Sequence, residues 1–255
     1  MKSKKKSLLK ILAGVVAIAL ISGIIFITNS FVGNPISAMM ANRAIKQYVN
    51  QKYSTLDLEI EKAKYNFKTS SYAAMAESKT SIDTKFEIYY RGGKVQRDDY
   101  EYFVESRFNT LDRFSKEYSI ITKDIVSKEL GYENNNTMVL YNKADMENAK
   151  NIVELDMKFD KTLPLDPEVT IQLDLSDNTI ESIAKILTGA HKAFVNNNCN
   201  FTKYGLYSSK DGIDVMVYGV TPKDIESGQL VSLLEKAKNN DGATGIGVSI
   251  KGEKK

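Results

Sequence analysis

The sequence has very few of the side chains on which most catalytic and metal sites depend. Among its 255 residues there is one cysteine, Cys199, one histidine, His191, and no tryptophan. A single cysteine cannot form an intramolecular disulfide, so the fold must be stabilised by buried apolar surface. A single histidine excludes zinc sites with two histidine ligands, and any Ser-His or Cys-His pair would have to use His191. Phosphate loops ending in Gly-Lys-Ser/Thr are also missing.

Charged side chains are missing from a stretch near the N-terminus. Residues 11–28 contain none, and a helix of that length spans roughly 27 Å, enough to cross a bilayer core. Four of the first six residues are lysines and Lys10 borders the stretch, whereas the next basic residue is Arg43. The positive-inside rule therefore predicts a cytoplasmic Lys-rich tail over 1–7, a transmembrane helix over 8–28, and an extracytoplasmic remainder.

A cleaved signal peptide is the alternative interpretation, because secretory signals also begin with a basic segment followed by an apolar one. Against it, the apolar run exceeds the roughly 7 to 15 residues of a signal core. The residues that follow, Thr28, Asn29 and Ser30, offer no clear cleavage site between small residues. We therefore expect a retained single-pass anchor, with the membrane lipid bilayer as the partner of residues 8–28. The reverse orientation would require the N-terminal lysines to face outward.

The chain after the apolar stretch is nearly neutral. Five of the 35 Lys and Arg precede residue 28, which leaves 30 against 32 Asp and Glu. Nucleic-acid binding needs a concentrated basic face, so we expect no nucleic acid partner. The 227 residues after Thr28 are enough for two ordinary cores.

A first domain is predicted over 34–131. Asn34-Pro35 is typical of a capped helix start, and an apolar stripe at helical spacing follows it. Apolar residues then alternate over 56–60 and again, in the opposite phase, over 63–67, which predicts a β-bulge. Short strands should follow, with a hairpin turn at Gly92-Gly93.

The longest helix after the apolar stretch is predicted to begin at Asp98-Asp99 and to end at Gly131. Its acidic residues suit the helix N-terminus, and glycine suits the position after the last turn. An apolar stripe along this helix needs a sheet to cover, and we expect the preceding strands to supply it. Residues 133–136 have neither periodicity nor apolar side chains, so the domain boundary is placed there.

A second domain is predicted over 137–255. Apolar residues suggest a short strand at 138–140 and alternate over 153–159 and 169–175. Helices should begin at Asp177-Asn178 and at Thr221-Pro222, with a hairpin at Asp211-Gly212 between them and a terminal strand over 246–250. The predicted fold class is α+β: a transmembrane helix followed by two small two-layer α+β domains with antiparallel sheets.

His191 and Cys199 are the obvious candidates for chemistry. His191 lies at the flank of a helical apolar stripe, which is typical of a half-buried packing histidine. Cys199 follows the predicted end of that helix and could approach His191 only if the chain reversed sharply. A buried, inert thiol is the better interpretation.

Capping, turn formation and packing explain the other groups of polar, glycine and tyrosine residues that could suggest a site. None has calcium-loop or dinucleotide-loop spacing, so we expect no catalytic, cofactor-binding or metal residues and no cofactor. The groups are Asp174 with Asp177 and Asn178; Asn239 with Asn240 and Asp241; Gly245 with Gly247; Asp98 and Asp99 with Glu101 and Glu105; and Tyr89 and Tyr90 with Tyr100 and Tyr102.

Short segments follow the apolar stretch in a recognisable order. They are Gly33-Asn34-Pro35-Ile36, Tyr48-Val49, Lys52-Tyr53, Leu56-Asp57-Leu58-Glu59-Ile60, Tyr65-Asn66-Phe67-Lys68, Thr80-Ser81-Ile82-Asp83-Thr84 and Asp98-Asp99-Tyr100. In this combination the chain resembles the YfjL-like membrane-anchored proteins of Gram-positive bacteria, best over residues 8–103. The resemblance implies an envelope protein of an uncharacterised family, and it carries no catalytic or binding residues to transfer.

Two functions follow as hypotheses. The first is a membrane-anchored envelope protein whose extracytoplasmic part is a non-catalytic binding or accessory module for an envelope or membrane partner. The second is an envelope hydrolase that uses carboxylates alone, a chemistry that needs neither histidine nor cysteine. The lack of a convergent acid, base and nucleophile favours the first.

Overall fold

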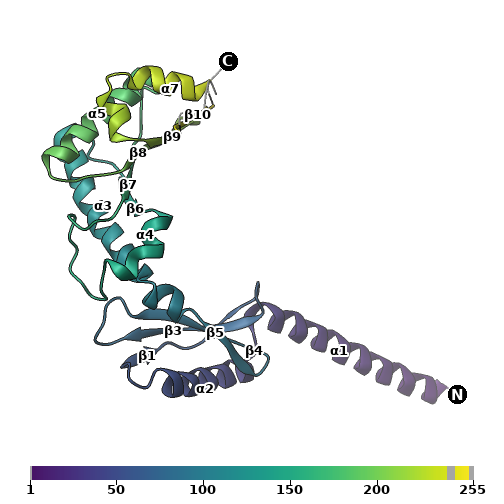
Figure 1. The fold of residues 1–255 in the computed structure, drawn as a ribbon. Coiled ribbons are helices and arrows are strands. Elements are labelled where there is room, and N and C mark those ends of the chain that lie inside the picture. Colours follow the sequence, from purple (N-terminus) through teal and green to yellow (C-terminus); the bar gives the residue numbers. More distant parts are fainter. Residues whose placement is uncertain (1, 240–244, 253–255) are drawn as a thin grey trace. The chain divides into compact units, whose positions relative to one another are not determined.

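The computed structural model describes residues 2–239 and 245–252, with side chains from Lys10 onward. The chain divides into two compact units, unit 1 (Met1–Val104) and unit 2 (Glu105–Lys255). The fold class is α+β, as predicted: a long apolar N-terminal helix precedes two sheets that carry helices (Figure 1).

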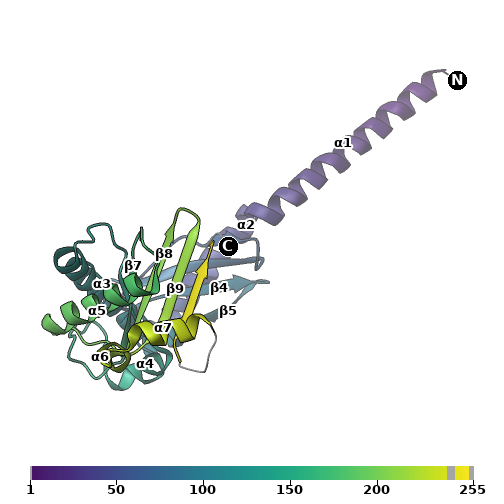
Figure 2. The same cartoon turned by 90° about the horizontal axis from the view of Figure 1, so that it is seen from above.

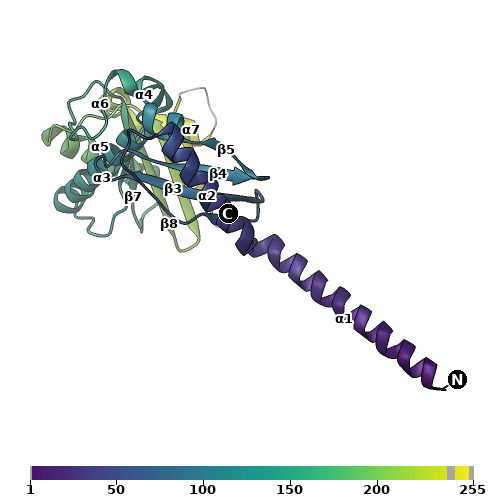
Figure 3. The same cartoon turned by 90° about the horizontal axis from the view of Figure 1, so that it is seen from below.

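Unit 1 is built on an antiparallel sheet in which β3 pairs with β4, β4 with β5, and both β1 and β2 with the free edge of β3. Helix α2 lies across this sheet (Figure 3). The elements of unit 1 are α1 (Lys2–Val32), α2 (Pro35–Lys52), β1 (Leu58–Ile60), β2 (Lys64–Asn66), β3 (Ser71–Ser78), β4 (Lys85–Arg91) and β5 (Lys94–Asp98).

Helix α2 begins where the sequence predicts. The Asn34 side chain accepts hydrogen bonds from the amides of Ile36 (2.8 Å) and Ser37 (3.2 Å), and proline occupies the first helical position. The side chains that α2 buries recur at four-residue steps and face the sheet: Ala41, Ile45 and Val49. Tyr53, at the end of α2, joins a cluster of aromatic rings with Phe86 and Tyr100.

The predicted phase change between 56–60 and 63–67 is confirmed. Ile60 pairs with Ala76 and Lys64 pairs with Ala73, so three residues on this side oppose two on β3. The Gly92-Gly93 hairpin is also confirmed, and both residues have the positive φ that a two-residue turn of type I′ requires, 60° and 88°.

Unit 2 has a mixed sheet in the order β10-β9-β8-β7-β6. Figure 2 shows β8 and β9 side by side, joined by the predicted hairpin at Asp211-Gly212. All pairs are antiparallel except β7 with β8, because α5 crosses over between these two strands. The elements are α3 (Phe108–Leu130), β6 (Met138–Tyr141), α4 (Lys143–Asn148), β7 (Pro167–Gln172), α5 (Ile180–Asn196), β8 (Lys203–Lys210), β9 (Ile213–Val220), α6 (Pro222–Glu226), α7 (Leu230–Lys238) and β10 (Gly247–Lys251).

One continuous core fills unit 2. It combines buried side chains of α3, α5 and α7 with those of the sheet, and Ile171, Ile183, Leu187, Phe194 and Leu206 are completely or almost completely buried within it. A smaller cluster lies beneath the segment between β6 and β7 and includes Phe114, Tyr141 and Val153.

The long predicted helix is corrected in two ways. Residues Glu101–Glu105 form a single π-helical turn, and Arg107, with φ of 68°, interrupts the helix before α3 begins at Phe108. Helix α3 packs against β6 and α5 and contributes Tyr118 to the core of unit 2. The domain boundary therefore lies near residue 104 and not at 131–137.

The strand predicted over 153–159 is wrong. Burial alternates there as the sequence suggests, but Asp156 has φ of 61° and turns the chain, so no ladder forms. A short 3-10 turn (Ala149–Asn151) precedes this segment, and the segment itself has irregular backbone. Phe159 packs its ring 5.4 Å from Phe114 and 5.2 Å from Tyr118.

Candidate functional site

Helix α1 is apolar and uncovered. Its large side chains are exposed over its described length, including Ile18 at 67% and Phe26 at 74%. Covering such a surface with water is unfavourable, and burying it in lipid removes that cost. The described part of the chain has one helix of membrane-spanning length and composition, and a signal sequence shares both features.

The junction between α1 and α2 is fixed by hydrogen bonds to the sheet of unit 1. The Tyr72 hydroxyl accepts from the Asn34 amide (2.7 Å) and donates to the Asn34 carbonyl (2.9 Å). Gly33, with φ of 76°, lies so close to Tyr65 and Tyr72 that a Cβ would be 2.7 Å from the Tyr72 hydroxyl. The start of α2 is therefore held by the close packing of the Gly33-Asn34 backbone against Tyr65 and Tyr72, and no free linker separates α1 from unit 1's sheet.

Unit 2 contains a cleft of about 700 Å³, a volume typical of small-ligand sites. The buried residues Tyr118 and Tyr141 contribute to its lining, and one wall is the irregular segment before β7. Both polar and apolar side chains line it. The lining residues are Tyr118, Tyr141, Asp160, Lys161, Thr162, Leu163, Leu165, Pro167, Asn198 and Asn200.

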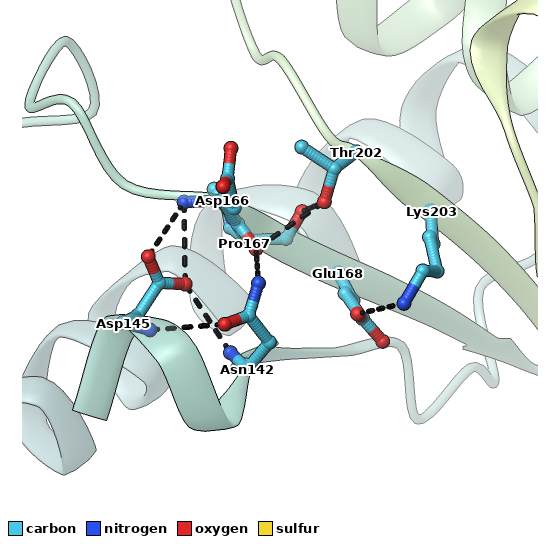
Figure 4. Close-up of polar contacts among 7 residues, drawn as sticks. All are labelled: Asn142, Asp145, Asp166, Pro167, Glu168, Thr202 and Lys203. Carbon is cyan, nitrogen blue, oxygen red and sulfur yellow. Dashed lines mark hydrogen bonds and ion pairs between the residues drawn. The ribbon is translucent and has the colours of Figure 1, made fainter. Parts of the chain in front are cut away.

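A network of polar contacts holds that wall in place (Figure 4). Asn142 and Asp145 form a capping box at the start of α4, with Asn142 Oδ1 accepting from the Asp145 amide (2.9 Å). The Asp145 carboxyl also accepts from the Asp166 amide (3.0 Å). The Asp166 carbonyl accepts from Asn142 Nδ2 and from the Thr202 hydroxyl, both at 3.3 Å. These bonds fix the chain at the end of the cleft wall, immediately before Pro167.

Burial raises the pKa of the Asp145 carboxyl above its usual range. The hydrogen bonds from the backbone amides of Asp166 and Asn142 lower the pKa but do not offset the burial. Burial likewise raises the pKa of the Tyr141 hydroxyl, with Asp145 contributing. Asp145 is 5% exposed, and its two oxygens accept from backbone amides, so its place in the structure is that of a cap.

Cys199 is completely buried in the core of unit 2, as predicted. Burial raises the pKa of its thiol, although Lys161 and Tyr118 act in the opposite direction. A thiol with a raised pKa has little thiolate at neutral pH and is a poor nucleophile. Tyr118, 1% exposed, also has a raised hydroxyl pKa, chiefly through burial and then through Cys199.

His191 has partners that its sequence position did not reveal. Its Nδ1 lies 2.8 Å from the Tyr204 hydroxyl, and its Nε2 lies 3.1 Å from Glu226 Oε1. The Tyr204 ring packs edge-on against the imidazole, with centroids 5.3 Å apart. The arrangement joins α5, β8 and α6, and neither ring nitrogen is left for a substrate or metal.

The carboxylates at 98–105 lie in different surroundings. Asp98 ends β5 with its side chain 6% exposed and accepts hydrogen bonds from the Tyr48 hydroxyl, Lys52 Nζ (2.9 Å) and the Tyr100 amide (3.0 Å). Burial opposes ionisation, but the hydrogen bonds of Tyr48, Lys52 and Tyr100 outweigh it and leave the pKa of Asp98 lowered. Glu101 and Glu105 are exposed.

Asp99 belongs to a separate group on the other face of the sheet. It pairs with Arg97 and accepts from the Tyr89 hydroxyl (2.9 Å). Burial and hydrogen bonding to Glu87 and Asp99 raise the pKa of Tyr89. Tyr90 and Tyr100 lie within or beside the core under α2, so they do not share one surface with Tyr89 and Tyr102.

The remaining candidate residues that the structure describes lie at helix ends, in turns, or in or beside a strand. Asp177 accepts from the Thr179 amide (3.0 Å), and Thr179 caps α5. Asp174 lines a shallow polar pocket with residues 133–136. Asn240 and Asp241 lie outside the described residues. Gly245 and Gly247 precede and begin β10, and no helix follows them in the described chain. Within 10–239 and 245–252, no three metal-ligating side chains come together.

Models of two protein domains match most of the chain. The YfjL-like N-terminal domain matches residues 8–99, and the YfjL-like C-terminal domain matches residues 117–235. The chain belongs to the YfjL-like family. The two YfjL-like domains fall within unit 1 and unit 2, with the gap between them at the π-helical turn and the start of α3. No curated protein and no solved structure matches the chain.

The cleft of the YfjL-like C-terminal domain was not predicted from the sequence. One signal for it was present, since Asn142-x-x-Asp145 has the spacing of a capping box that opens a helix. The contact that fixes the cleft wall could not be predicted from local sequence, because Asp145 binds the Asp166 amide 21 residues further along the chain.

Proposed function

We propose that this YfjL-like protein is a single-pass membrane-anchored envelope protein with the N-terminus in the cytoplasm. Its extracytoplasmic units form a non-catalytic binding or accessory module. The observation that carries the proposal is α1, whose apolar side chains are exposed and which leads directly into a folded unit. The lysines at the N-terminus support the orientation.

The cleft of unit 2 is the binding site in this proposal. Its volume of about 700 Å³ suits a peptide segment or a small polar ligand. Its rim offers the amides of Asn198 and Asn200 and the ammonium of Lys161, which donates to the Asn197 carbonyl at 2.7 Å. Groups of this kind orient a ligand through hydrogen bonds and need no charge on the ligand.

The environments of the reactive side chains support a non-catalytic role. Cys199 is buried with a raised thiol pKa, and His191 has both ring nitrogens within hydrogen-bond distance of protein groups. Asp98 and Asp145 are buried carboxyls committed to partners within their own units. None of these four groups lines the cleft. A general acid or base must reach the substrate proton.

Site-specific photo-cross-linking in living cells tests the proposal. A photoreactive residue replaces Asn200, which is exposed in the cleft, or Met216, which is 48% exposed on β9 and outside the cleft. We expect an envelope or membrane partner to be captured from position 200 and not from 216. A chain with the ectodomain deleted and α1 retained serves as the background.

Capture from position 216 alone would contradict the cleft as the binding site. Purified ectodomain that degraded cell-wall material, and lost this activity when a particular Asp or Glu was changed to its amide, would contradict the non-catalytic role. Protection of a C-terminal tag from external protease in intact cells would overturn the orientation.

A further inference from the structure

Three segments of unit 1 meet at the end from which α1 departs. They are the first turn of α2, the β2–β3 turn (67–70) and the β4–β5 turn (91–94), and we call this end of the unit the proximal end. The register places both turns at the same end of the strands, because Tyr72 pairs with Tyr65 on one side and Tyr90 on the other. A groove of about 370 Å³ joins Asn29 of α1 to Gly92 and Gly93. Figure 1 shows α1 leaving beside the tip of β4.

Large apolar side chains are exposed at the proximal end. Phe31 of α1 and Phe67 of the β2–β3 turn are in ring contact, with centroids 5.9 Å apart, and remain 62% and 52% exposed. Further apolar side chains on the first two turns of α2 are exposed to solvent. These are Ile36, Met39 and Met40, each more than half exposed. A surface of this kind, continuous with a membrane helix, is unfavourable in water.

The same end carries cations without balancing acids. The β2–β3 turn contains Lys68, and the β4–β5 turn contains Arg91 and Lys94, all exposed. Neither turn contains an Asp or Glu. Among the described residues, none of these three side chains is in an ion pair. Cations flanking exposed aromatic and aliphatic groups match a phospholipid surface, where phosphates lie just outside the acyl chains.

The opposite end of the same sheet differs. Its β3–β4 turn (79–84) has one exposed large apolar residue, Ile82, and its cation Lys79 is paired with Asp57. Asp83 is buried there. The apolar and cationic side chains therefore concentrate at the end that adjoins α1.

We propose that the proximal end of unit 1 docks onto the phospholipid headgroup layer of the leaflet in which α1 ends. Phe67, Met39 and Met40 enter the boundary between headgroups and acyl chains. Lys68, Arg91 and Lys94 bind lipid phosphates. The proposal rests on the proposed membrane anchor, since α1 runs only four residues past Thr28 before α2 begins at Pro35. The rigid Gly33-Asn34 junction then holds unit 1 against the membrane surface.

Depth-dependent fluorescence quenching of the full chain in vesicles tests the docking. Thr69→Cys and Thr80→Cys are matched probe sites, because both are exposed threonines in turns at opposite ends of the sheet and both hydroxyls contact a serine two residues away. Ala17→Cys reports insertion of α1. Cys199 is completely buried, so the unsubstituted chain is the labelling blank. The vesicles contain phosphatidylglycerol and phosphatidylcholine, with nitroxides on headgroups or acyl chains.

We expect acyl nitroxides to quench the probe at residue 17, and headgroup nitroxides to quench residue 69 at least about threefold more than residue 80. Strong quenching at 17 with equal quenching at 69 and 80 would overturn the docking and leave the anchor standing. No quenching at 17 would overturn both proposals.

A second measurement isolates the cations. The triple variant Lys68→Gln, Arg91→Gln, Lys94→Gln should reduce headgroup quenching at residue 69 about twofold in vesicles with phosphatidylglycerol. The matched variant Lys79→Gln, at the opposite end, should leave it unchanged. Equal quenching in the triple variant and the unsubstituted chain would show that the cations do not bind lipid phosphates.

Discussion

Unit 1 and unit 2 bury their sheets in different ways. In unit 1 a single helix, α2, covers the sheet, and much of the interior consists of aromatic rings. One of them, Tyr72, is bound to the Asn34 backbone through its hydroxyl. In unit 2 the helices α3, α5 and α7 contribute to one continuous and largely aliphatic core. Stability from burial scales with apolar area. We therefore expect unit 2 to be the more stable unit and unit 1 to depend more on individual contacts.

The two units also treat a buried carboxyl in opposite ways. Asp98 in unit 1 is bound by an ammonium and a hydroxyl, which favour its charged form and lower its pKa. Asp145 in unit 2 is bound by backbone amides only, and burial dominates and raises its pKa. When burial is similar, the donors that bind the carboxyl and the charges near it decide the direction in which its pKa shifts.

Removing a core phenylalanine from each unit should have the largest effect. Phe86→Ala in unit 1 and Phe194→Ala in unit 2 each delete a side chain that is at most 1% exposed. Each should lower the free energy of unfolding of its own unit by about 3–5 kcal/mol. Hydrogen exchange followed by mass spectrometry measures protection in each unit separately. Loss of protection in both units from either substitution would show that they unfold as one body.

Gly33→Ala should be the next most damaging change, and it acts on unit 1 alone. Positive φ and the contact of a new Cβ with Tyr65 and Tyr72 should together cost about 2–3 kcal/mol. Gly92→Ala is the matched control, because Gly92 also has positive φ but open space around its Cβ position, and it should cost only about 1 kcal/mol. Urea unfolding monitored by proteolysis of unit 1 gives both values. Equal costs would mean that Tyr65 and Tyr72 can move aside.

Much of the local structure could be predicted because it depends on residues adjacent in sequence. The Asn34 cap, the two-residue hairpins at Gly92-Gly93 and Asp211-Gly212, and the phase change before β2 follow from turn chemistry and alternation. The Thr221-Pro222 helix start is confirmed by a capping box with Asp224. These features need no knowledge of the rest of the chain.

The errors concern partners distant in sequence. The apolar stripe of α3 shows that the helix covers a surface but does not identify which sheet it covers. The helix packs on the sheet that follows it in sequence, and not on the preceding strands as predicted. Alternation over 153–159 reported burial correctly, yet a strand also needs a neighbour with free backbone groups. The partners of Asp98 and of His191 lie 46–50 and 13–35 residues away, beyond any local pattern.

Asp98→Asn should weaken unit 1 by about 1.5 kcal/mol at neutral pH, since hydrogen bonds to a charged group are replaced by weaker ones. The folded pKa of Asp98 is lowered, so its contribution is fully present above the usual carboxyl value of 3.8 and is lost as pH falls through the lowered folded pKa. The unsubstituted unit 1 should therefore lose this increment on acidification, and the variant should not. The urea midpoint of unit 1, measured from neutral to strongly acidic pH, tests this. The same dependence of the midpoint on pH in the unsubstituted chain and in the variant would contradict it.

Asp145→Asn should have the smallest effect and the opposite pH dependence. Because the folded pKa of Asp145 is raised, its favourable contribution is complete below the usual value of 3.8 and is lost as pH rises through the folded pKa. A neutral amide does not titrate, so the variant should cost about 1 kcal/mol or less and should remove the decline of unit 2 stability with rising pH. Cys199 reports opening of unit 2, because its buried thiol reacts with a dipyridyl disulfide only when the core is exposed, and this reagent works in mild acid. A variant whose thiol reactivity kept the original pH dependence would show that another group in unit 2 titrates, and the contrast between the two carboxyls would then rest on Asp98 alone.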